Sequence, residues 1–247
     1  MGVGIHTLNF DGSEEVGAGA VALRFRARRP VGHRAGQHAF WHIPGGGIAP
    51  FTIASAPEES HVVLATNAGA HSRLKRALGA LEPGVRVVLA GPLASFTLEG
   101  AGRDVVMLAQ GIGVTPFRAM LTHIAATELD VAATLVHVGA AQGPYAGHAY
   151  RAHTEAMANE AFYVTGRDEF AAHLDTTAAA RPAATFFASG SPAFVDATIA
   201  ALVQRGIRRD RIRRDGFSGW SAPPLASAPG PDPSGDLLER NAGLSWA

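Results

Sequence analysis

The sequence predicts a β + α/β fold in two parts, an antiparallel β-barrel or sandwich followed by a parallel α/β domain. The chain has 247 residues, 47% of them hydrophobic, which is enough for one large core or two smaller ones. Short apolar runs separated by turn residues fill roughly the first hundred positions. After them, apolar runs alternate with segments of helical periodicity, as in strands joined by helical crossovers.

The first part is expected to contain short strands and one helix. In the run 21–28, Leu23, Phe25 and Ala27 alternate with arginines, so one face is expected to enter a core. Turn clusters such as Pro44-Gly45-Gly46-Gly47 separate the runs. The other strands are expected at 38–43, 61–66 and 85–89, and the helix at 72–81.

The second part alternates strands and helices. We expect strands at 105–109, 133–138, 162–165 and 185–188. We expect helices at 116–126, 148–158, 168–174 and 192–205. Ligands of such sheets bind beyond the carboxyl ends of the strands, where Gly111-Ile112-Gly113 and Ser189-Gly190-Ser191-Pro192 both lie.

The segment Gly111–Pro116 has the pattern of an anion site. It joins a buried strand to an amphipathic helix, and its glycines allow the backbone to approach a ligand closely. Free N–H groups at the start of the helix would face that ligand with the positive end of the helix dipole. The alternative is a tight strand-to-helix turn that binds nothing, because a lone Gly-x-Gly is weak evidence.

Composition excludes several function classes. The 21 basic and 21 acidic residues balance, so bulk charge does not indicate nucleic-acid binding. The absence of cysteine excludes disulfides and cysteine-ligated zinc or iron–sulfur centres. Eleven histidines occur without a zinc motif or an acidic cluster, so no metal site is expected. No signal peptide and no membrane-spanning run is visible, so a cytoplasmic location is expected.

Five segments, in order and spacing, resemble the ferredoxin–NADP reductase-like superfamily of flavoprotein reductases over roughly residues 1–220. Ala35-Gly36-Gln37-His38 resembles a Pro-Gly-Gln strand entry, and Pro50-Phe51-Thr52-Ile53-Ala54-Ser55 resembles the Arg-x-Tyr/Phe-Ser/Thr flavin motif. Gly91-Pro92-Leu93-Ala94-Ser95-Phe96 resembles a barrel-closing segment, and Gly111-Ile112-Gly113-Val114-Thr115-Pro116 resembles a nicotinamide-nucleotide loop. Asp215-Gly216-Phe217-Ser218-Gly219-Trp220 resembles a C-terminal aromatic end.

The resemblance implies a flavin-binding antiparallel six-stranded β-barrel over 1–99 and a five-stranded parallel NAD(P)-binding α/β domain over 100–220. Residues 221–247, rich in Pro, Ala and Ser, are expected to be a flexible tail. The resemblance also implies transfer of electrons from NADH or NADPH through FAD to a separate acceptor. That acceptor would be a ferredoxin-like protein, an oxygenase component or a small molecule, because a chain without cysteine holds no iron–sulfur domain of its own.

The resemblance also implies roles for individual residues. Thr52, near flavin N5, and Ser189, near the hydride path, are the catalytic candidates. Phe51 would lie against one flavin face and Phe217 or Trp220 against the other. The remaining flavin contacts would be Ile53 and Ser55 at the ring edge and ribityl chain, with Gly69, His71 and Ser72 at the pyrophosphate. The dinucleotide would be held by Gly111, Gly113, Thr115 and Pro116, with Gly190 and Pro192 beside the nicotinamide.

The chain departs from the superfamily where cations are expected. Ala49 and Asn67 stand in place of two arginines that would contact the flavin phosphates. These changes leave open an alternative, a diverged member with weak or lost flavin binding that acts as a nucleotide-binding or regulatory module or a non-redox enzyme. Gly139-Ala140-Ala141-Gln142 offers no cation to a 2′-phosphate, which favours NADH over NADPH. The arginine-rich run 205–214 predicts either a solvated surface or a docking patch for an acidic redox partner.

Overall fold

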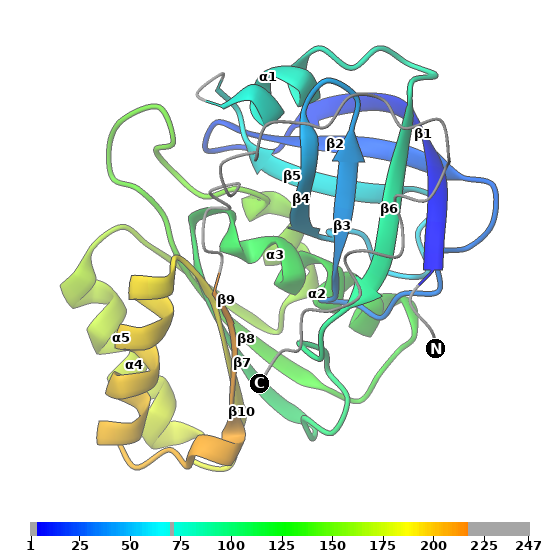
Figure 1. Ribbon diagram of the computed structural model, residues 1–247. Helices are drawn as coiled ribbons and strands as arrows, with labels where there is room; N and C mark the ends of the chain where they lie inside the picture. Colours follow the sequence, from blue (N-terminus) through cyan, green and yellow to red (C-terminus); the bar gives the residue numbers. More distant parts are fainter. Residues whose placement is uncertain (1–3, 70–71, 217–247) are drawn as a thin grey trace, which may run out of the picture.

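The computed structural model describes residues 4–69 and 72–216, which form two packed sheets (Figure 1). The first is antiparallel, with strand order β4-β3-β6-β1-β2-β5. Its edge strands β4 and β5 contact each other, so the sheet curls into a half-barrel. The predicted six-stranded antiparallel part is confirmed. Its elements are β1 (Gly4–Glu15), β2 (Ala20–Ala27), β3 (His38–Ile43), β4 (Gly47–Thr52), β5 (Val62–Asn67), α1 (Arg73–Gly79) and β6 (Arg86–Leu93).

Aromatic side chains fill the inside of the half-barrel. Phe25 lies between Phe10 and Trp41, with ring centroids 5.5 Å and 5.3 Å away. Helix α1 packs Leu74 and Leu78 against the same cluster and so covers one end of the barrel. Phe25 and Leu23 are buried as their alternation with arginines predicted.

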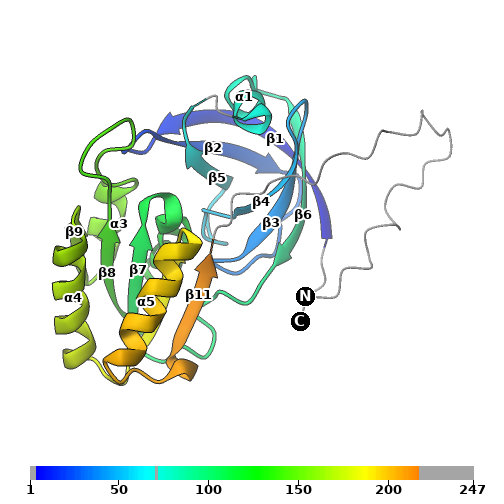
Figure 2. The ribbon, with the colours of Figure 1, turned by 60° about the vertical axis from the view of Figure 1, so that its left-hand side comes forward.

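The second sheet is parallel, with order β11-β10-β7-β8-β9 (Figure 2). The predicted five-stranded α/β part is confirmed. Its strands are β7 (Asp104–Gln110), β8 (Ala132–Val138), β9 (Glu160–Val164), β10 (Thr185–Gly190) and β11 (Ile212–Gly216). Its helices are η1 (Gly111–Val114), α2 (Thr115–Ala126), α3 (Arg151–Met157), α4 (Arg167–Ala180), α5 (Pro192–Gln204) and η2 (Arg209–Arg211).

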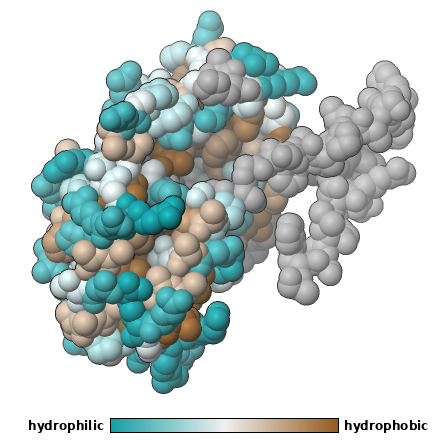
Figure 3. Space-filling model, turned by 90° about the vertical axis from the view of Figure 1, so that its left-hand side faces the viewer, coloured by the Kyte–Doolittle hydropathy of each residue, from teal (hydrophilic) through white to brown (hydrophobic). Residues whose placement is uncertain are grey.

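The helices form two layers on opposite faces of the parallel sheet. Phe117 and Met120 of α2 pack in one cluster with Ala22 and Val63 on the outside of the barrel, so α2 lies between the two sheets. Leu174 of α4 and Leu202 of α5 pack on the other face. That outer face mixes hydrophilic and hydrophobic residues (Figure 3). The resulting layering places the start of α2 at the junction of the two parts.

Several element predictions were incomplete. Strands β1, β4 and β11 lie in segments for which no strand was expected. Helix α4 runs six residues past its predicted end, to Ala180. Helix α3 begins at Arg151 rather than 148, because Tyr150 adopts a left-handed conformation (φ 58°) that precedes the helix.

Two features are absent from the residues that the structure describes. No helix in 4–69 and 72–216 is long and apolar enough to cross a membrane. Within the same ranges, no three histidine or acidic side chains are grouped so that they could hold a metal ion.

Candidate functional site

Three of the five motif segments meet at Gln37. The side-chain Nε2 of Gln37 donates to Ala94 O at 2.9 Å, and the backbone carbonyl of Gln37 accepts from Ile53 N at 2.9 Å. Gly36, just before it, has φ 95°, and an added Cβ would press on Phe96 O and on the methyl group of Met120. A glycine is therefore required here by both conformation and space. These contacts bring the strand entry, the flavin-motif segment and the barrel-closing segment together beside α2.

The Gly111–Pro116 segment is the predicted strand–turn–helix. β7 ends at Gln110, η1 forms one tight turn, and α2 begins at Thr115 with Pro116 in its first turn. A Cβ at Gly113 would lie 2.5 Å from Ser189 O, so η1 packs directly on the end of β10. Gly111 (φ 53°) has open space where its Cβ would stand. Gly113, Thr115 and Pro116 are buried, which leaves Gly111 and Ile112 as the accessible part of the turn.

The ends of β7 and β10 are tied together by side chains. Gln110 Oε1 accepts from Ser191 Oγ at 2.6 Å. Ser191 also caps α5, where its Oγ accepts from Phe194 N at 3.3 Å, and Pro192 opens that helix as predicted. The carboxyl edge of the sheet is therefore held in one arrangement by backbone packing and by this small network.

Two buried hydroxyl groups at this junction have no hydrogen-bond partner among the described residues: Thr52 Oγ1 at the end of β4 and Ser189 Oγ near the end of β10. Thr52 is 3% exposed and Ser189 is 0% exposed. An unpaired buried hydroxyl costs free energy, so such groups call for an explanation. Both residues are the catalytic candidates of the sequence analysis.

Asp215 was missed as a site residue. It lies opposite Ser189 in the parallel pairing of β10 with β11. Its neighbour along that face, Arg213, stands over the Phe187 ring on the barrel side of the sheet. Burial raises the pKa of Asp215 to about 6. The motif Asp215-Gly216-Phe217 contained this residue, but spacing alone did not show which face it occupies.

His137 was missed as well. It is fully buried on β8, and its Nε2 lies 2.9 Å from Gly111 O. Burial lowers its pKa to about 4, so the ring is neutral at pH 7 and Nε2–H donates to the carbonyl. This hydrogen bond from His137 therefore holds the backbone of the Gly111 turn in place. A lone histidine in an apolar strand carried no signal for this contact.

The predicted flavin residues occupy different environments. Ile53 is fully buried, and Ser55 is buried with its hydroxyl accepting from Val63 N at 3.1 Å. Phe51 is half-buried and packs against the barrel core. Ser72 caps α1 by accepting from Lys75 N at 3.2 Å, and Gly69 is exposed. His71, Phe217 and Trp220 lie outside the described residues.

The two substituted arginine positions differ in burial. Ala49 lies directly opposite Trp41, a core residue, and is 4% exposed. Opposite residues of an antiparallel pair share a face, so Ala49 lies on the core side of β4. Asn67 lies opposite Ala20, on the outer face that packs toward α2, and is half-buried. Arg73 beside this region donates to Gly45 O at 2.7 Å.

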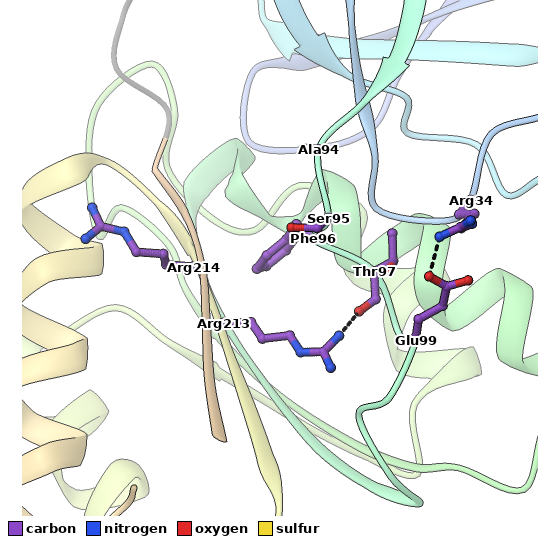
Figure 4. Close-up of a pocket in the computed structure, with 8 residues that line it drawn as sticks. All are labelled: Arg34, Ala94, Ser95, Phe96, Thr97, Glu99, Arg213 and Arg214. Carbon is purple, nitrogen blue, oxygen red and sulfur yellow. Dashed lines mark hydrogen bonds and ion pairs between the residues drawn. The ribbon is translucent and has the colours of Figure 1, made fainter. Parts of the chain in front are cut away.

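A cavity of about 510 Å³ lies between the barrel-closing segment and β11 (Figure 4). Arg34 pairs with Glu99 on one wall, and Arg213 donates to Thr97 O on another. Arg214 also borders the cavity, but its guanidinium lies on the other side of β11, where it pairs with Asp196 of α5 at 3.2 Å. The arginine-rich run is thus divided between two faces by the alternation of β11.

Comparisons with known proteins support the fold. The chain is similar to a vanillate O-demethylase oxidoreductase from Pseudomonas sp. strain HR199, with 33% identity over 99 residues. The match covers 39% of this chain and 31% of that protein, so it spans less than a third of the relative. No protein-family profile matches the chain.

Solved structures match over most of the chain. The ferredoxin reductase in carbazole 1,9a-dioxygenase has a TM-score of 0.75 at 18% identity, over 88% of this chain and 70% of that one. A cytochrome P450 reductase from Amycolatopsis has 0.69 at 19%, over 87% and 70%. A ferredoxin NADP+ reductase from Neisseria gonorrhoeae, with bound FAD and NADP, has 0.67 at 15%, over 86% and 98%. The chain has the two-part fold of the ferredoxin reductases. The predicted resemblance is confirmed for the fold.

Proposed function

We propose that the protein is a flavin-dependent NAD(P)H oxidoreductase that passes electrons from NAD(P)H through FAD to a separate acceptor. One observation carries the proposal. Within the ferredoxin reductase fold, the barrel motifs and the carboxyl edge of the parallel sheet meet around η1, with an unpartnered buried hydroxyl on each side. FAD, when bound, supplies the chemistry that accepts a hydride and releases electrons.

The two hydroxyls have complementary tasks in this proposal. Thr52 Oγ1, which has no partner among the described residues, would donate to the flavin ring near N5, and Ser189 Oγ would orient the nicotinamide on the opposite side. A hydrogen bond to the ligand would offset the free-energy cost of burying each hydroxyl unpaired. Phe51 would lie along one flavin face, while Ile53 and Ser55 would hold the ring edge. Ser55 Oγ accepts from Val63 N and Ser55 O accepts from His33 Nε2, so the hydroxyl hydrogen of Ser55 remains to donate in this contact.

The dinucleotide is held at the turn after β7. Backbone N–H groups beginning at Gly111 face the pyrophosphate, while Gly113, Thr115 and Pro116 keep the turn closed against β10. The neutral His137 imidazole holds the Gly111 carbonyl away from the ligand. Gly190 and Pro192 border the nicotinamide.

Asp215 supplies a proton-holding group beside Ser189. With a pKa near 6 it exchanges its proton close to neutral pH. We assign it a role in the charge balance beside the nicotinamide and not in a hydrogen bond to Ser189 Oγ, which has no partner among the described residues. NADH is the preferred donor, because 139–142 carries no cation for a 2′-phosphate.

The acceptor is an oxygenase component, a ferredoxin-like protein or a small molecule. The vanillate O-demethylase oxidoreductase and the carbazole dioxygenase reductase, both named for oxygenase systems, favour the first of these. A cytoplasmic location is part of the proposal, and cell fractionation tests it.

A second candidate is a diverged member of the fold that has lost tight flavin binding. The buried environment of Ala49 favours it, since a guanidinium on the core side of β4 would have to displace packed side chains. Such a protein would bind a nucleotide as a regulatory module or act without redox chemistry.

The absorption spectrum of the purified protein separates the two candidates. The reductase predicts a yellow protein, or one that becomes yellow with added FAD, whose flavin absorbance is bleached by NADH without oxygen. Colourless protein that ignores FAD contradicts it. Calorimetry with NADH then tests the second candidate, which predicts nucleotide binding without flavin reduction.

A further inference from the structure

A second cavity, of about 250 Å³, lies between the outer face of the barrel and the start of α2. Its walls come from β1, β2, β5 and the loop before β5 on one side, and from Arg118 and Tyr150 on the other. A water molecule takes about 30 Å³ in the liquid, so the space matches about eight waters or one small solute. None of the residues proposed for the flavin or the dinucleotide lines it.

Three residues that line this cavity carry polar atoms without a partner among the described residues. They are Arg24 Nε, Arg118 Nε and Tyr150 OH, and all three are sheltered from bulk solvent. Tyr150 is 8% exposed as a whole residue. The two Nε–H groups donate, and the phenol can donate as well. The cavity is therefore bordered by unpaired donors that lie just beneath its surface.

The carboxylates nearby do not satisfy these donors. The Glu59 carboxylate accepts from Arg118 NH1 and NH2 and from Ala56 N. The Nε–H of Arg118 is left without an acceptor on this carboxylate. Glu14 reaches Arg24 only through NH1, at 3.6 Å, beyond ordinary hydrogen-bond range. Arg24 Nε, Arg118 Nε and Tyr150 OH therefore have no acceptor oxygen among the described residues, although Glu14 and Glu59 also line the cavity.

Tyr150 is held in this place by unusual backbone geometry. Its left-handed φ of 58° is uncommon for a residue with a side chain, and its N–H donates to Val16 O of the barrel at 2.6 Å. The Arg118 guanidinium stands 5.7 Å from the centre of the Tyr150 ring. The barrel thus positions Tyr150 against Arg118, and burial keeps its hydroxyl protonated by raising its pKa.

From this arrangement we propose that the cavity binds a small oxyanion, a phosphate or a carboxylate, between Arg24, Arg118 and Tyr150. Two guanidinium groups and a phenol offer charge-assisted hydrogen bonds to several oxygens at once. The ion would join the barrel to the first turn of α2, which follows the Gly111 turn directly. The proposal does not rest on flavin binding and applies to the protein without FAD.

Calorimetric titration of the full chain with inorganic phosphate, and separately with succinate, tests this. We expect saturable binding with a dissociation constant of about 1 mM for one of them, and the preferred ion identifies the source of the oxygens. Tyr150→Phe and Arg24→Gln should each weaken binding about tenfold. Arg103→Gln, an exposed arginine paired with Asp130 outside the cavity, is the charge-matched control and should bind as the wild type does.

The free energy of unfolding of each variant shows whether a loss of ion binding comes from misfolding. Tyr150→Phe removes a hydroxyl that has no partner in the described part of the chain. Its free energy of unfolding without the ion should therefore match the wild type, while the stabilisation by the ion is lost. Absence of saturable binding of either ion overturns the proposal. Equal binding by the wild type and both cavity variants also overturns it, because the ion would then bind elsewhere.

Discussion

The carboxyl edge of the parallel sheet and the β4–α1 side of the barrel differ in how their predicted ligand contacts are built. At the sheet edge, the contacts are backbone: Gly113 packs on Ser189, and His137 holds Gly111. On the barrel side, the resemblance predicted two arginines, and the sequence has Ala49 and Asn67 at those positions. Close backbone packing cannot change without moving the fold, whereas a charged side chain whose partner is a ligand can be lost without moving the backbone. The fold can therefore persist while flavin affinity falls.

The largest expected effect is at Gly113. In Gly113→Ala the new Cβ would lie 2.5 Å from Ser189 O and 2.8 Å from Gly190 Cα, so β10 and η1 must move apart. We expect a loss of about 3 kcal/mol in the free energy of unfolding, together with loss of nucleotide binding. Urea denaturation and calorimetry with NADH measure the two effects.

Gly79→Ala is the matched control. Nothing lies within 4 Å of a Cβ at Gly79, which ends helix α1. Alanine is the better helix former, so stability should stay level or rise by up to about 1 kcal/mol. If Gly113→Ala is as stable as this control, the sheet edge is not as closely packed as described.

The second expected effect is at Thr52. Thr52→Val keeps the shape of the side chain and removes a buried hydroxyl that has no partner in residues 4–69 and 72–216. Stability should therefore stay level or rise by about 1 kcal/mol. Reduction of bound flavin by NADH should slow about 10- to 100-fold, because a donor to the flavin ring is lost. Anaerobic stopped-flow absorbance measures the rate.

Thr154→Val is the control, because it removes a buried hydroxyl that is hydrogen-bonded. The Thr154 hydroxyl pairs with Tyr163 OH at 2.8 Å and Tyr150 O at 3.0 Å, away from the proposed flavin contacts. This variant should lose about 1 kcal/mol of stability and keep its reduction rate. An unchanged rate in Thr52→Val would remove Thr52 from the site.

Much of the fold could be predicted, because apolar periodicity marks buried strands and amphipathic helices. The three missed strands each break that signal. In β1 the Asp11-Gly12-Ser13 sequence suggests a turn, but the register shift at Gly12 shows a β-bulge within one strand. In β4, Pro50 argues against a strand, yet β4 is an edge strand, where a missing N–H is tolerated. β11 is also an edge strand, and its arginines hide its alternation.

The site was predictable where it depends on local sequence and not where it depends on distant contacts. The turn at Gly111–Pro116 and the cap at Ser191 follow from residues a few positions apart. The contact of His137 with Gly111 joins residues 26 positions apart. The pairing of Ser189 with Asp215 depends on the register of two strands. No spacing rule in a single sequence reveals such contacts.

The third expected effect is a pH dependence from Asp215. Its pKa is about 6 in the folded protein and 3.8 in the reference state, so the folded protein holds the proton more tightly. Stability that this proton provides is fully present below about pH 4, and is lost as the pH rises to about 6. Asp215→Asn should remove this loss, making the variant about 2 kcal/mol more stable than the wild type at pH 8.

Unfolding in urea at pH 5 and pH 8 tests the Asp215 prediction. The wild-type difference between the two pH values should shrink in Asp215→Asn. It should persist in Asp130→Asn, whose carboxylate is 80% exposed. If Asp215→Asn and Asp130→Asn behave alike, burial of Asp215 does not raise its pKa in solution.

The smallest expected effect returns to the two positions that lack arginine. Asn67→Arg places a cation on the outer face at the end of β5, next to the segment predicted to meet the flavin pyrophosphate. One charge-assisted contact should raise FAD affinity about tenfold. Ala49→Arg, on the core side opposite Trp41, should leave FAD affinity unchanged and lower stability by about 2 kcal/mol. Fluorescence titration with FAD compares the two variants. A rise in affinity for Ala49→Arg alone would show that the phosphate end of the site lies on the β4 side and has kept its shape. If neither variant binds FAD better, more than charge separates this barrel from one that holds the flavin tightly.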